Sequence, residues 1–171
     1  TKHHSIHFYP DDVMMLNSFL FAFQKIYGIL PTVKNSGKYY RVRIDSKPIV
    51  LDLLEYGSFR SLEWSLPYIL FKSDVDKVEW LRAFYDCEAY VGNKVIAVQS
   101  VNKEGLEQVK ELLTKFGIES KLYTYKRKQK NWNINYLLYI TKKKYRQTFL
   151  KRIGFNHQRK QKKLEIIAGV A

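Results

Sequence analysis

The chain contains two copies of one arrangement of secondary structure, and this internal repeat limits its fold more than any other feature. The segment Tyr27-Gly28-Ile29 reappears as Phe116-Gly117-Ile118, 89 positions later (117 − 28). In both places an amphipathic helical pattern precedes the glycine, which can end a helix because it tolerates a positive φ. A strand, a basic turn and a second strand follow in each copy, so the repeat predicts two half-domains of shared topology.

Each copy of the repeat begins with a strand and a helix and ends with a short helix. Residues 13–27 in the first half and residues 106–116 in the second have apolar positions at helical spacing, each after an alternating strand pattern. We therefore expect an α+β fold with two antiparallel sheets, in which the halves comprise residues 1–72 and 73–171. Chance similarity of two hairpin-and-helix segments is the alternative.

A further helix is predicted over residues 73–88, between the two copies. Ser73 can cap its first turn, with Asp76 three residues later, and Pro67 separates it from the preceding connector. Apolar residues cover much of its circumference, so we expect this helix to lie in an interior. An ordinary core helix without a functional role explains the same pattern. The apolar residues form two stripes, one of Trp80, Ala83, Phe84 and Cys87 and one of Val78, Leu81 and Tyr85.

Two acidic residues, Asp86 and Glu88, lie at the end of this helix, just before a short strand at Tyr90 and Val91. Negative charge at a helix C-terminus opposes the helix dipole, and a carboxylate near a buried surface must be paired, protonated or bound to metal. Solvation at the helix end, or pairing with the many lysine and arginine residues, is the simpler explanation of both acids.

Residues 81–89, Leu-Arg-Ala-Phe-Tyr-Asp-Cys-Glu-Ala, resemble the LAGLIDADG motif of homing endonucleases, in the archaeal variant whose last acid is glutamate. The flanking segments, residues 67–72, 102–104 and 154–161, are also similar to archaeal members of the intron or intein type. The resemblance covers most of the chain, and an internal repeat is typical of the single-chain members of the family.

The resemblance implies two pseudo-symmetric α-β-β-α-β-β-α halves whose antiparallel sheets form a DNA-binding saddle. Motif helices pack side by side in this family, and Ala83 and Cys87 match the small residues that allow their close approach. The last acid of each motif coordinates metal, which implies that Glu88 binds Mg²⁺ or another divalent ion. Asp86 matches a helix-end residue that holds structure. Ala89 replaces the family's glycine, so the turn into the next strand is expected to differ.

The chain contains one such motif, whereas the resemblance implies two. Shifting Glu88 back by the repeat offset of 89 places the second acid just before Thr1, so the first half-domain lacks its motif helix. That helix then belongs to a removed or separate N-terminal piece or to a second copy of the chain, or else the protein is a degenerate non-nuclease. We favour the first explanation, because an interior helix without its partner would expose an apolar stripe.

Polar and apolar side chains alternate along the strands of both hairpins, as expected if one sheet face covers a core and the other contacts DNA. A two-stranded ribbon fits the major groove, where arginine can bond guanine and asparagine can bond adenine. Basic residues at the second, longer turn are expected to bind phosphates. An ordinary solvated sheet face is the alternative. The predicted DNA contacts are Tyr39, Arg41, Arg43, Lys126, Arg127, Lys128, Lys130, Asn131, Asn133 and Asn135.

The composition is that of a folded, basic, intracellular protein. Lys and Arg total 30 against 16 Asp and Glu, and the formal charge of +14 favours a polyanion such as double-stranded DNA as the partner. Hydrophobic residues make up 46% of the chain, which excludes a disordered basic tail. The single cysteine, Cys87, excludes a disulfide framework. No apolar run reaches the ~18 residues of a membrane span, and we expect a cytoplasmic protein without a membrane partner.

These observations favour a site-specific DNA endonuclease that makes metal-dependent double-strand breaks at a long intron-insertion target. Glu88 and a partner acid would hold Mg²⁺ near the scissile phosphates. A basic side chain, Lys72 or Lys160, would stabilise the charge that develops on the phosphate. The alternative is a cleavage-deficient DNA- or RNA-binding protein, such as an intron maturase.

Overall fold

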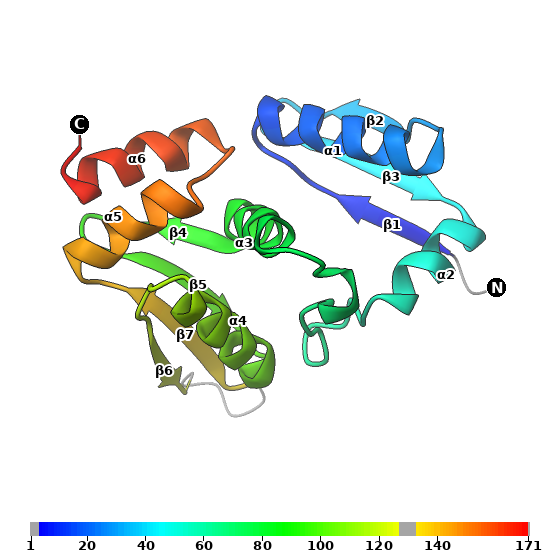
Figure 1. Cartoon of the computed structure of the whole chain (residues 1–171). Helices are drawn as coiled ribbons and strands as arrows, with labels where there is room; N and C mark the ends of the chain where they lie inside the picture. The colour runs from blue at the N-terminus through cyan, green and yellow to red at the C-terminus, as the bar shows by residue number, and fades with distance from the viewer. Residues whose placement is uncertain (1–3, 127–132, 171) are drawn as a thin grey trace. The chain divides into compact units, whose positions relative to one another are not determined.

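The computed structural model describes residues 4–126 and 133–170, and the chain divides into two compact units (Figure 1). The N-terminal unit comprises Thr1–Tyr56 and the C-terminal unit comprises Gly57–Ala171. Both units combine helices with an antiparallel sheet, so the α+β class predicted from the sequence is confirmed.

The N-terminal unit packs a helix on a small three-stranded sheet of order β1-β3-β2. Asp12 begins the helix α1 by accepting hydrogen bonds from the backbone N–H groups of Met14 and Met15, and Gly28 ends it with a φ of 70°. The core is small, since its cluster of buried residues consists of Phe23, Ile44 and Ile49. The elements are β1 (Ser5–Phe8), α1 (Val13–Tyr27), β2 (Thr32–Asn35), β3 (Tyr40–Asp45) and α2 (Lys47–Glu55).

The C-terminal unit has a four-stranded sheet of order β4-β5-β7-β6 with helices packed against it. Its elements are η1 (Tyr68–Leu70), α3 (Asp74–Glu88), β4 (Ala89–Val91), β5 (Ile96–Ser100), α4 (Lys103–Lys115), β6 (Lys121–Tyr125), β7 (Asn135–Ile140), α5 (Lys143–Arg152) and α6 (Gln158–Ala168). Except for the added α6, this is the α-β-β-α-β-β-α order that the resemblance implies.

The internal repeat predicted from the sequence is visible in the strand order. Strands β5, β7 and β6 neighbour one another as β1, β3 and β2 do, and both sets are antiparallel. Gly117 follows α4 with a φ of 74°, as Gly28 follows α1 with a φ of 70°. Helix α3 and strand β4 precede the repeat in the C-terminal unit, and the described elements of the N-terminal unit contain no counterpart of them.

The connector, residues 57–72, belongs to the C-terminal unit, whereas the sequence analysis assigned it to the first half-domain. The backbone N–H of Leu66 donates to Oε1 of Gln108 over 2.9 Å, and the amide of Asn102 donates to the carbonyl of Trp64 over 2.5 Å. The Trp64 ring lies directly over Gly105 of α4. These contacts at α4 place the division at residue 56 rather than residue 72. The order of segments along the sequence does not show against which unit an apolar connector packs.

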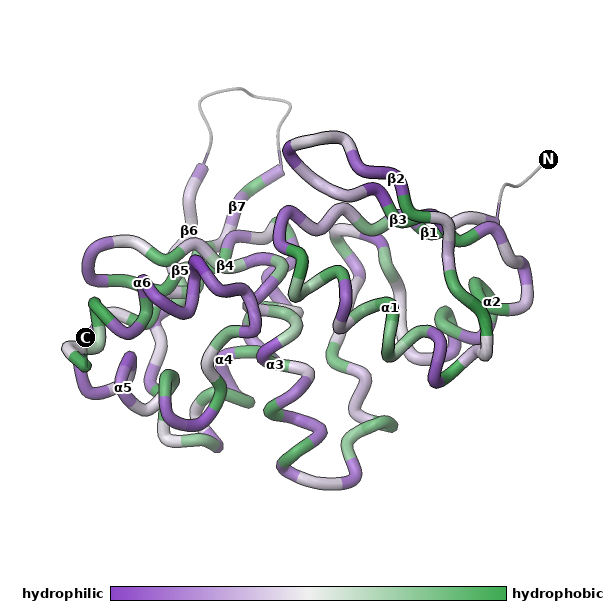
Figure 2. The backbone as a smooth tube through the Cα atoms, turned by 90° about the horizontal axis from the view of Figure 1, so that it is seen from above, coloured by the Kyte–Doolittle hydropathy of each residue, from purple (hydrophilic) through white to green (hydrophobic). Residues whose placement is uncertain are grey.

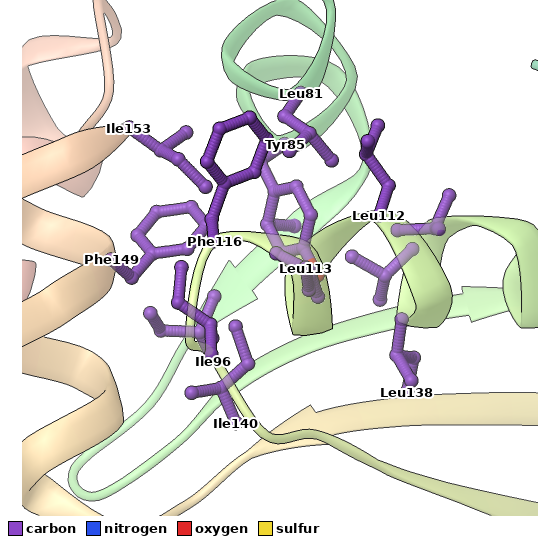
Figure 3. Close-up of a cluster of buried hydrophobic side chains, with 14 of the residues drawn as sticks. Leu81, Tyr85, Ile96, Leu112, Leu113, Phe116, Leu138, Ile140, Phe149 and Ile153 are labelled. Carbon is purple, nitrogen blue, oxygen red and sulfur yellow. The ribbon is translucent and has the colours of Figure 1, made fainter. Parts of the chain in front are cut away.

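The core of the C-terminal unit forms where α3, α4 and α5 meet the inner face of the sheet (Figure 3). Tyr85 from α3 packs against Phe149 from α5, with ring centroids 4.9 Å apart. Ile96, Leu138 and other fully buried residues contribute the sheet side of this cluster. The prediction that α3 lies in an interior is therefore confirmed for its Leu81 and Tyr85 face, which is completely buried.

Hydrophilic residues interrupt hydrophobic ones along the helices, as the colouring of Figure 2 shows. Within residues 4–126 and 133–170, no helix is long and apolar enough to cross a membrane.

Candidate functional site

Helix α3 has a well-defined start and ends directly in a strand. Ser73 and Asp76 form a capping box, in which the Ser73 hydroxyl accepts from the Asp76 N–H and the Asp76 carboxylate accepts from the Ser73 N–H over 2.7 Å. Glu88 is the last helical residue. Ala89 follows with a φ of −83° and begins β4, so no positive φ is needed where the family has glycine. Alanine therefore fits this turn without strain.

Asp86 is buried against the N-terminus of α6. Its two carboxylate oxygens accept hydrogen bonds from the backbone N–H groups of Asn156 and His157, over 3.1 Å and 3.0 Å. Burial raises the pKa of Asp86, although the two N–H donors and the nearby charge of Lys160 act in the opposite direction. The carboxylate thus caps α6, and its oxygens face protein rather than open space.

Lys160 makes the reciprocal contact from α6 to α3. Its Nζ donates to the carbonyl of Asp86 over 2.5 Å and lies 3.4 Å from the carbonyl of Tyr85. A cation at the C-terminal carbonyls of a helix interacts favourably with the helix dipole. Together, Asp86 and Lys160 join the end of α3 to the start of α6, and they hold the backbone that carries Glu88.

Glu88 is exposed, and its side chain has no hydrogen bond or ion pair with any residue that the structure describes. Within the described residues no three His, Cys, Asp or Glu side chains gather into a metal-binding group. Glu88 therefore offers one carboxylate at the end of α3. A hard divalent cation bound there would need further ligands besides Glu88.

Ala83 and Cys87 are four residues apart on an exposed face of α3, where the resemblance places the helix-packing positions. Desolvation by neighbouring atoms, with a smaller contribution from the charge of Glu88, raises the pKa of the Cys87 thiol to about 11, although part of the side chain reaches solvent. The thiol is therefore protonated at neutral pH.

Lys72, one of the two lysines predicted to stabilise charge on the phosphate, does not lie near Glu88. It precedes the capping box of α3, whereas Glu88 ends the helix. A helix of 15 residues rises about 22 Å, which is far beyond the reach of a lysine side chain. Of the two lysines predicted as catalytic, only Lys160 is brought to the end of α3 that carries Glu88.

The outer face of the N-terminal sheet carries the predicted arginines. Arg41 and Arg43 are exposed, whereas Val42 and Ile44 between and after them are buried, so the predicted alternation is confirmed in β3. Tyr39, just before β3, has an exposed fraction of 43%. These three residues are therefore accessible to a ligand.

The predicted contacts in the C-terminal sheet are placed less uniformly. Lys126 and Asn133 are exposed, but Asn135 has an exposed fraction of 2% and cannot reach a base in this conformation. Arg127, Lys128, Lys130 and Asn131 lie outside the described residues.

Tyrosines that are not among the predicted DNA contacts lie on the outer face of the C-terminal sheet. Tyr90, Tyr123 and Tyr125 have exposed fractions of 66%, 45% and 53%. Tyr139, partly buried, lies in the same row as Tyr90, with its ring centroid 5.4 Å from that of Tyr123. In the sequence, Tyr139 follows the apolar Leu138, and this alternation could have predicted that the tyrosine lies on the outer face.

Residues 76–154 match the family model described as the LAGLIDADG-like domain. The chain contains a LAGLIDADG-like domain. The matched region begins within α3, includes Glu88 and ends just after α5, so the recognition of this family from residues 81–89 is confirmed. The LAGLIDADG match stops before α6 and Lys160.

Two curated proteins of Methanocaldococcus jannaschii are similar in sequence. The glutamine–fructose-6-phosphate aminotransferase (isomerizing) is 33% identical over an alignment of 141 residues, which covers 78% of this chain and 13% of that protein. The replication factor C small subunit is 32% identical over 129 residues, which are 74% of this chain and 7% of that protein. The chain thus spans a small part of the length of both relatives.

Solved structures of the homing endonuclease I-DmoI share the fold. Its complex with DNA and Ca has a TM-score of 0.63 and 14% identity, covering 87% of this chain and 74% of that chain. Its complex with DNA and Mn has a TM-score of 0.62 and 14% identity, covering 87% and 80%. The predicted LAGLIDADG homing-endonuclease fold is therefore confirmed.

Proposed function

We propose that this chain is the DNA-binding and cleaving part of a site-specific, metal-dependent endonuclease. The observation that carries the proposal is Glu88, an exposed carboxylate without a partner among the described residues, at the end of the motif helix of a LAGLIDADG-like domain. The residues beside it are held in place by contacts between α3 and α6. An exposed carboxylate on a fixed backbone can bind a metal ion that the DNA substrate also coordinates.

Mg²⁺ or another divalent cation fits this site as a shared ligand of protein and DNA. Carboxylate oxygens are ligands that Mg²⁺ prefers, and it commonly combines one or two of them with water and substrate phosphates. When bound, such an ion lowers the pKa of a coordinated water and neutralises charge on the phosphate. The I-DmoI complexes with DNA and Ca or Mn support the use of a divalent ion by this fold.

The residues of this chain would bind and orient the DNA. Glu88 supplies carboxylate oxygens, and Asp86 fixes the end of its helix by capping α6. Lys160 contributes positive charge beside the Asp86 carbonyl, where it both neutralises the helix end and favours an approaching phosphate. The exposed Arg41 and Arg43 of β3 would bind DNA on the outer face of the N-terminal sheet.

The two relatives support a module whose function is separate from either of their named activities. An aminotransferase and a replication factor subunit have no chemistry in common, yet each contains a segment similar to this chain. These segments make up 13% and 7% of the two proteins. We therefore infer that the shared segment acts on nucleic acid by itself, and that an archaeal intron or intein is its source.

We further propose that a second motif helix covers the N-terminal unit. Helix α3 contributes to the core of the C-terminal unit, and Ile118 there is fully buried. Ile29, which follows Gly28 as Ile118 follows Gly117, has an exposed fraction of 50%. Leu54 of α2, equivalent to the partly buried Leu150 of α5, is 47% exposed. A helix like α3 would cover such residues and supply the second acid, whether from an N-terminal piece, a separate chain or a second copy.

Sedimentation of the chain identifies the source of that helix. A concentration-dependent dimer would indicate that a second copy supplies the apolar surface. A monomer that becomes active only when an N-terminal segment or a separate motif peptide is added would indicate the other sources.

Cleavage of plasmid libraries that carry candidate intron-insertion sites tests the endonuclease. With Mg²⁺ and a second motif helix supplied, we expect linear product, and Glu88→Gln should abolish cutting without weakening DNA binding, because it removes a charged metal ligand but preserves shape. Glu79→Gln is the matched control, since Glu79 is an exposed glutamate on the same helix that pairs with Arg82. Cleavage by the Glu88→Gln protein at the wild-type rate would show that Glu88 is not the metal ligand.

A nucleic-acid-binding protein without cleavage is the second candidate. It is favoured because, among the described residues, no three His, Cys, Asp or Glu side chains gather into a metal-binding group around Glu88. Salt-dependent binding without nicking, even after a second motif helix has been supplied, would support this function. Affinity that does not fall with salt would contradict both candidates, because binding to phosphates releases counterions.

A further inference from the structure

Arg43 on the outer face of the N-terminal sheet is held by an acid two residues along the same strand. Its Nε lies 3.0 Å from Oδ1 and 2.7 Å from Oδ2 of Asp45. Both side chains are about half exposed, at 49% and 56%. An exposed ion pair of this kind contributes little to stability, so its consequence is the orientation that it gives the guanidinium.

The contact with Asp45 occupies Nε and leaves both terminal amino groups of Arg43 without a partner among the described residues. Those two groups form the planar pair of donors that fits the O6 and N7 acceptors of guanine in the major groove. Because Asp45 already restricts the side chain, less rotamer freedom is lost when a base is bound. Arg43 is thus prepared for one particular base edge.

The neighbours of Arg43 allow such an approach. His7 and Thr32 flank it in the adjacent strands, and Arg41 on the same face is opposite Lys34. All four of these neighbours are exposed. Phosphate binding by Arg41 and Lys34 would bring the DNA backbone to this face without selecting a sequence.

The equivalent positions of the C-terminal sheet lack this chemistry. Ile44 pairs with Ile6 as Ile140 pairs with Ile96, so the residues that match Arg43 and Asp45 are Tyr139 and Thr141. Neither residue is a cation or an acid, and an arginine–acid pair of this kind is therefore confined to one repeat at these positions.

We propose that Arg43, held by Asp45, selects one guanine in the part of the target that contacts the N-terminal unit. The proposal rests on the proposed DNA-binding function and names a specificity-determining pair within it. Arg43 makes the base contact, whereas Asp45 is a positioning residue.

Selection of bound duplexes from a randomised pool, followed by atomic substitution in the selected site, tests this pair. We expect one guanine whose preference disappears in Arg43→Ala. Replacing that guanine by 7-deazaguanine removes the N7 acceptor and should weaken wild-type binding by about 3- to 10-fold, as expected for part of a bidentate contact. The same replacement should have no effect on Arg43→Ala, which lacks the donors that reach N7.

Asp45→Ala separates positioning from simple electrostatics. Removing an acid from a DNA-binding face should leave non-specific affinity equal or higher, whereas loss of orientation should reduce the guanine preference. Arg41→Ala is the matched control and should weaken binding to all sequences while keeping that preference. Unchanged thermal unfolding would show that these exposed substitutions leave the fold intact.

The outcomes distinguish this inference from the function on which it rests. No duplex binding at low salt would remove the proposed function itself. Duplex binding with no guanine preference, or an equal 7-deazaguanine effect in Arg43→Ala, would overturn the role of Arg43. Preferential binding of single strands would also overturn it, because an unpaired guanine presents no major groove.

Discussion

The contact between Asp86 and the start of α6 allows a quantitative test of how the end of the motif helix is held. In Asp86→Asn, the remaining oxygen can accept only from the N–H of Asn156 or from that of His157, and the new amide group meets the other donor. The loss of one charge-assisted bond costs about 1.5–3 kcal/mol. Loss of the charge at the helix N-terminus adds roughly 0.3–1 kcal/mol.

Relief of desolvation offsets part of that loss. Burial of the Asp86 carboxylate raises its pKa, which shows that the ionised form is penalised in the folded protein, and a neutral asparagine avoids this penalty. We therefore expect the free energy of unfolding to fall by about 1–3 kcal/mol.

Urea unfolding of the full chain, followed by circular dichroism, measures this change. For an m-value of about 2 kcal/mol/M, the midpoint of the transition that reports on the C-terminal unit should move down by about 0.5–1.5 M. Asp74→Asn is the control, because that side chain is 78% exposed and pairs with Lys77 on the surface of the same helix. The unfolding midpoint of Asp74→Asn should move by less than about half of the shift expected for Asp86→Asn.

A midpoint for Asp86→Asn equal to that of Asp74→Asn would refute the reasoning. It would mean that the two N–H groups at the start of α6 find other partners or water at no cost. In that case Asp86 would not be what holds the end of α3, and its oxygens would again be candidates for a functional role.

Three further predictions concern packing and pH. The Tyr85 hydroxyl is buried with no hydrogen-bond partner among the described residues, so Tyr85→Phe should raise the free energy of unfolding by about 1 kcal/mol or more, and a decrease would reveal a partner. A Cβ at Gly105 would lie 2.6 Å from the Trp64 ring, so Gly105→Ala should destabilise the protein by about 1–3 kcal/mol in urea despite the better helix propensity of alanine; stabilisation would contradict this contact. Burial and the hydrogen bond to Asp52 raise the pKa of Tyr27 to about 12, so its contribution to stability should be complete below pH 10 and be lost as the pH rises to 12. Tyr27→Phe should lack that alkaline loss, and an identical pH profile for both proteins would contradict the assignment.

Local patterns identified most of the secondary structure. Gly28, Gly117 and the Ser73 capping box end or begin helices where the sequence predicts, because each acts through contacts within one helical turn. The alternation of Arg41 and Arg43 with buried neighbours also needs no distant information, since side chains of a strand point to opposite faces.

Other features depended on contacts between distant residues. The distance between Lys72 and Glu88 could not be read from the order of motifs, and it is set by the rise of α3, which separates the two residues. Arg146 gave no signal within a basic segment, yet it is buried and donates to backbone carbonyls of Lys94, Thr141 and Ile167. Its position between these segments appears only when the helices and the sheet are assembled.

The sequence by itself determined the repeat, the motif helix and the acid at its end, because periodicity, caps and turns are local properties of a chain. Only the tertiary structure decided that Asp86 is bound by backbone groups 70 and 71 residues away, while Glu88 has no partner among the described residues. The two acids are separated by one residue, and their environments differ because α6 packs against one side of α3. Such packing depends on the combined burial of many side chains, which no local pattern records.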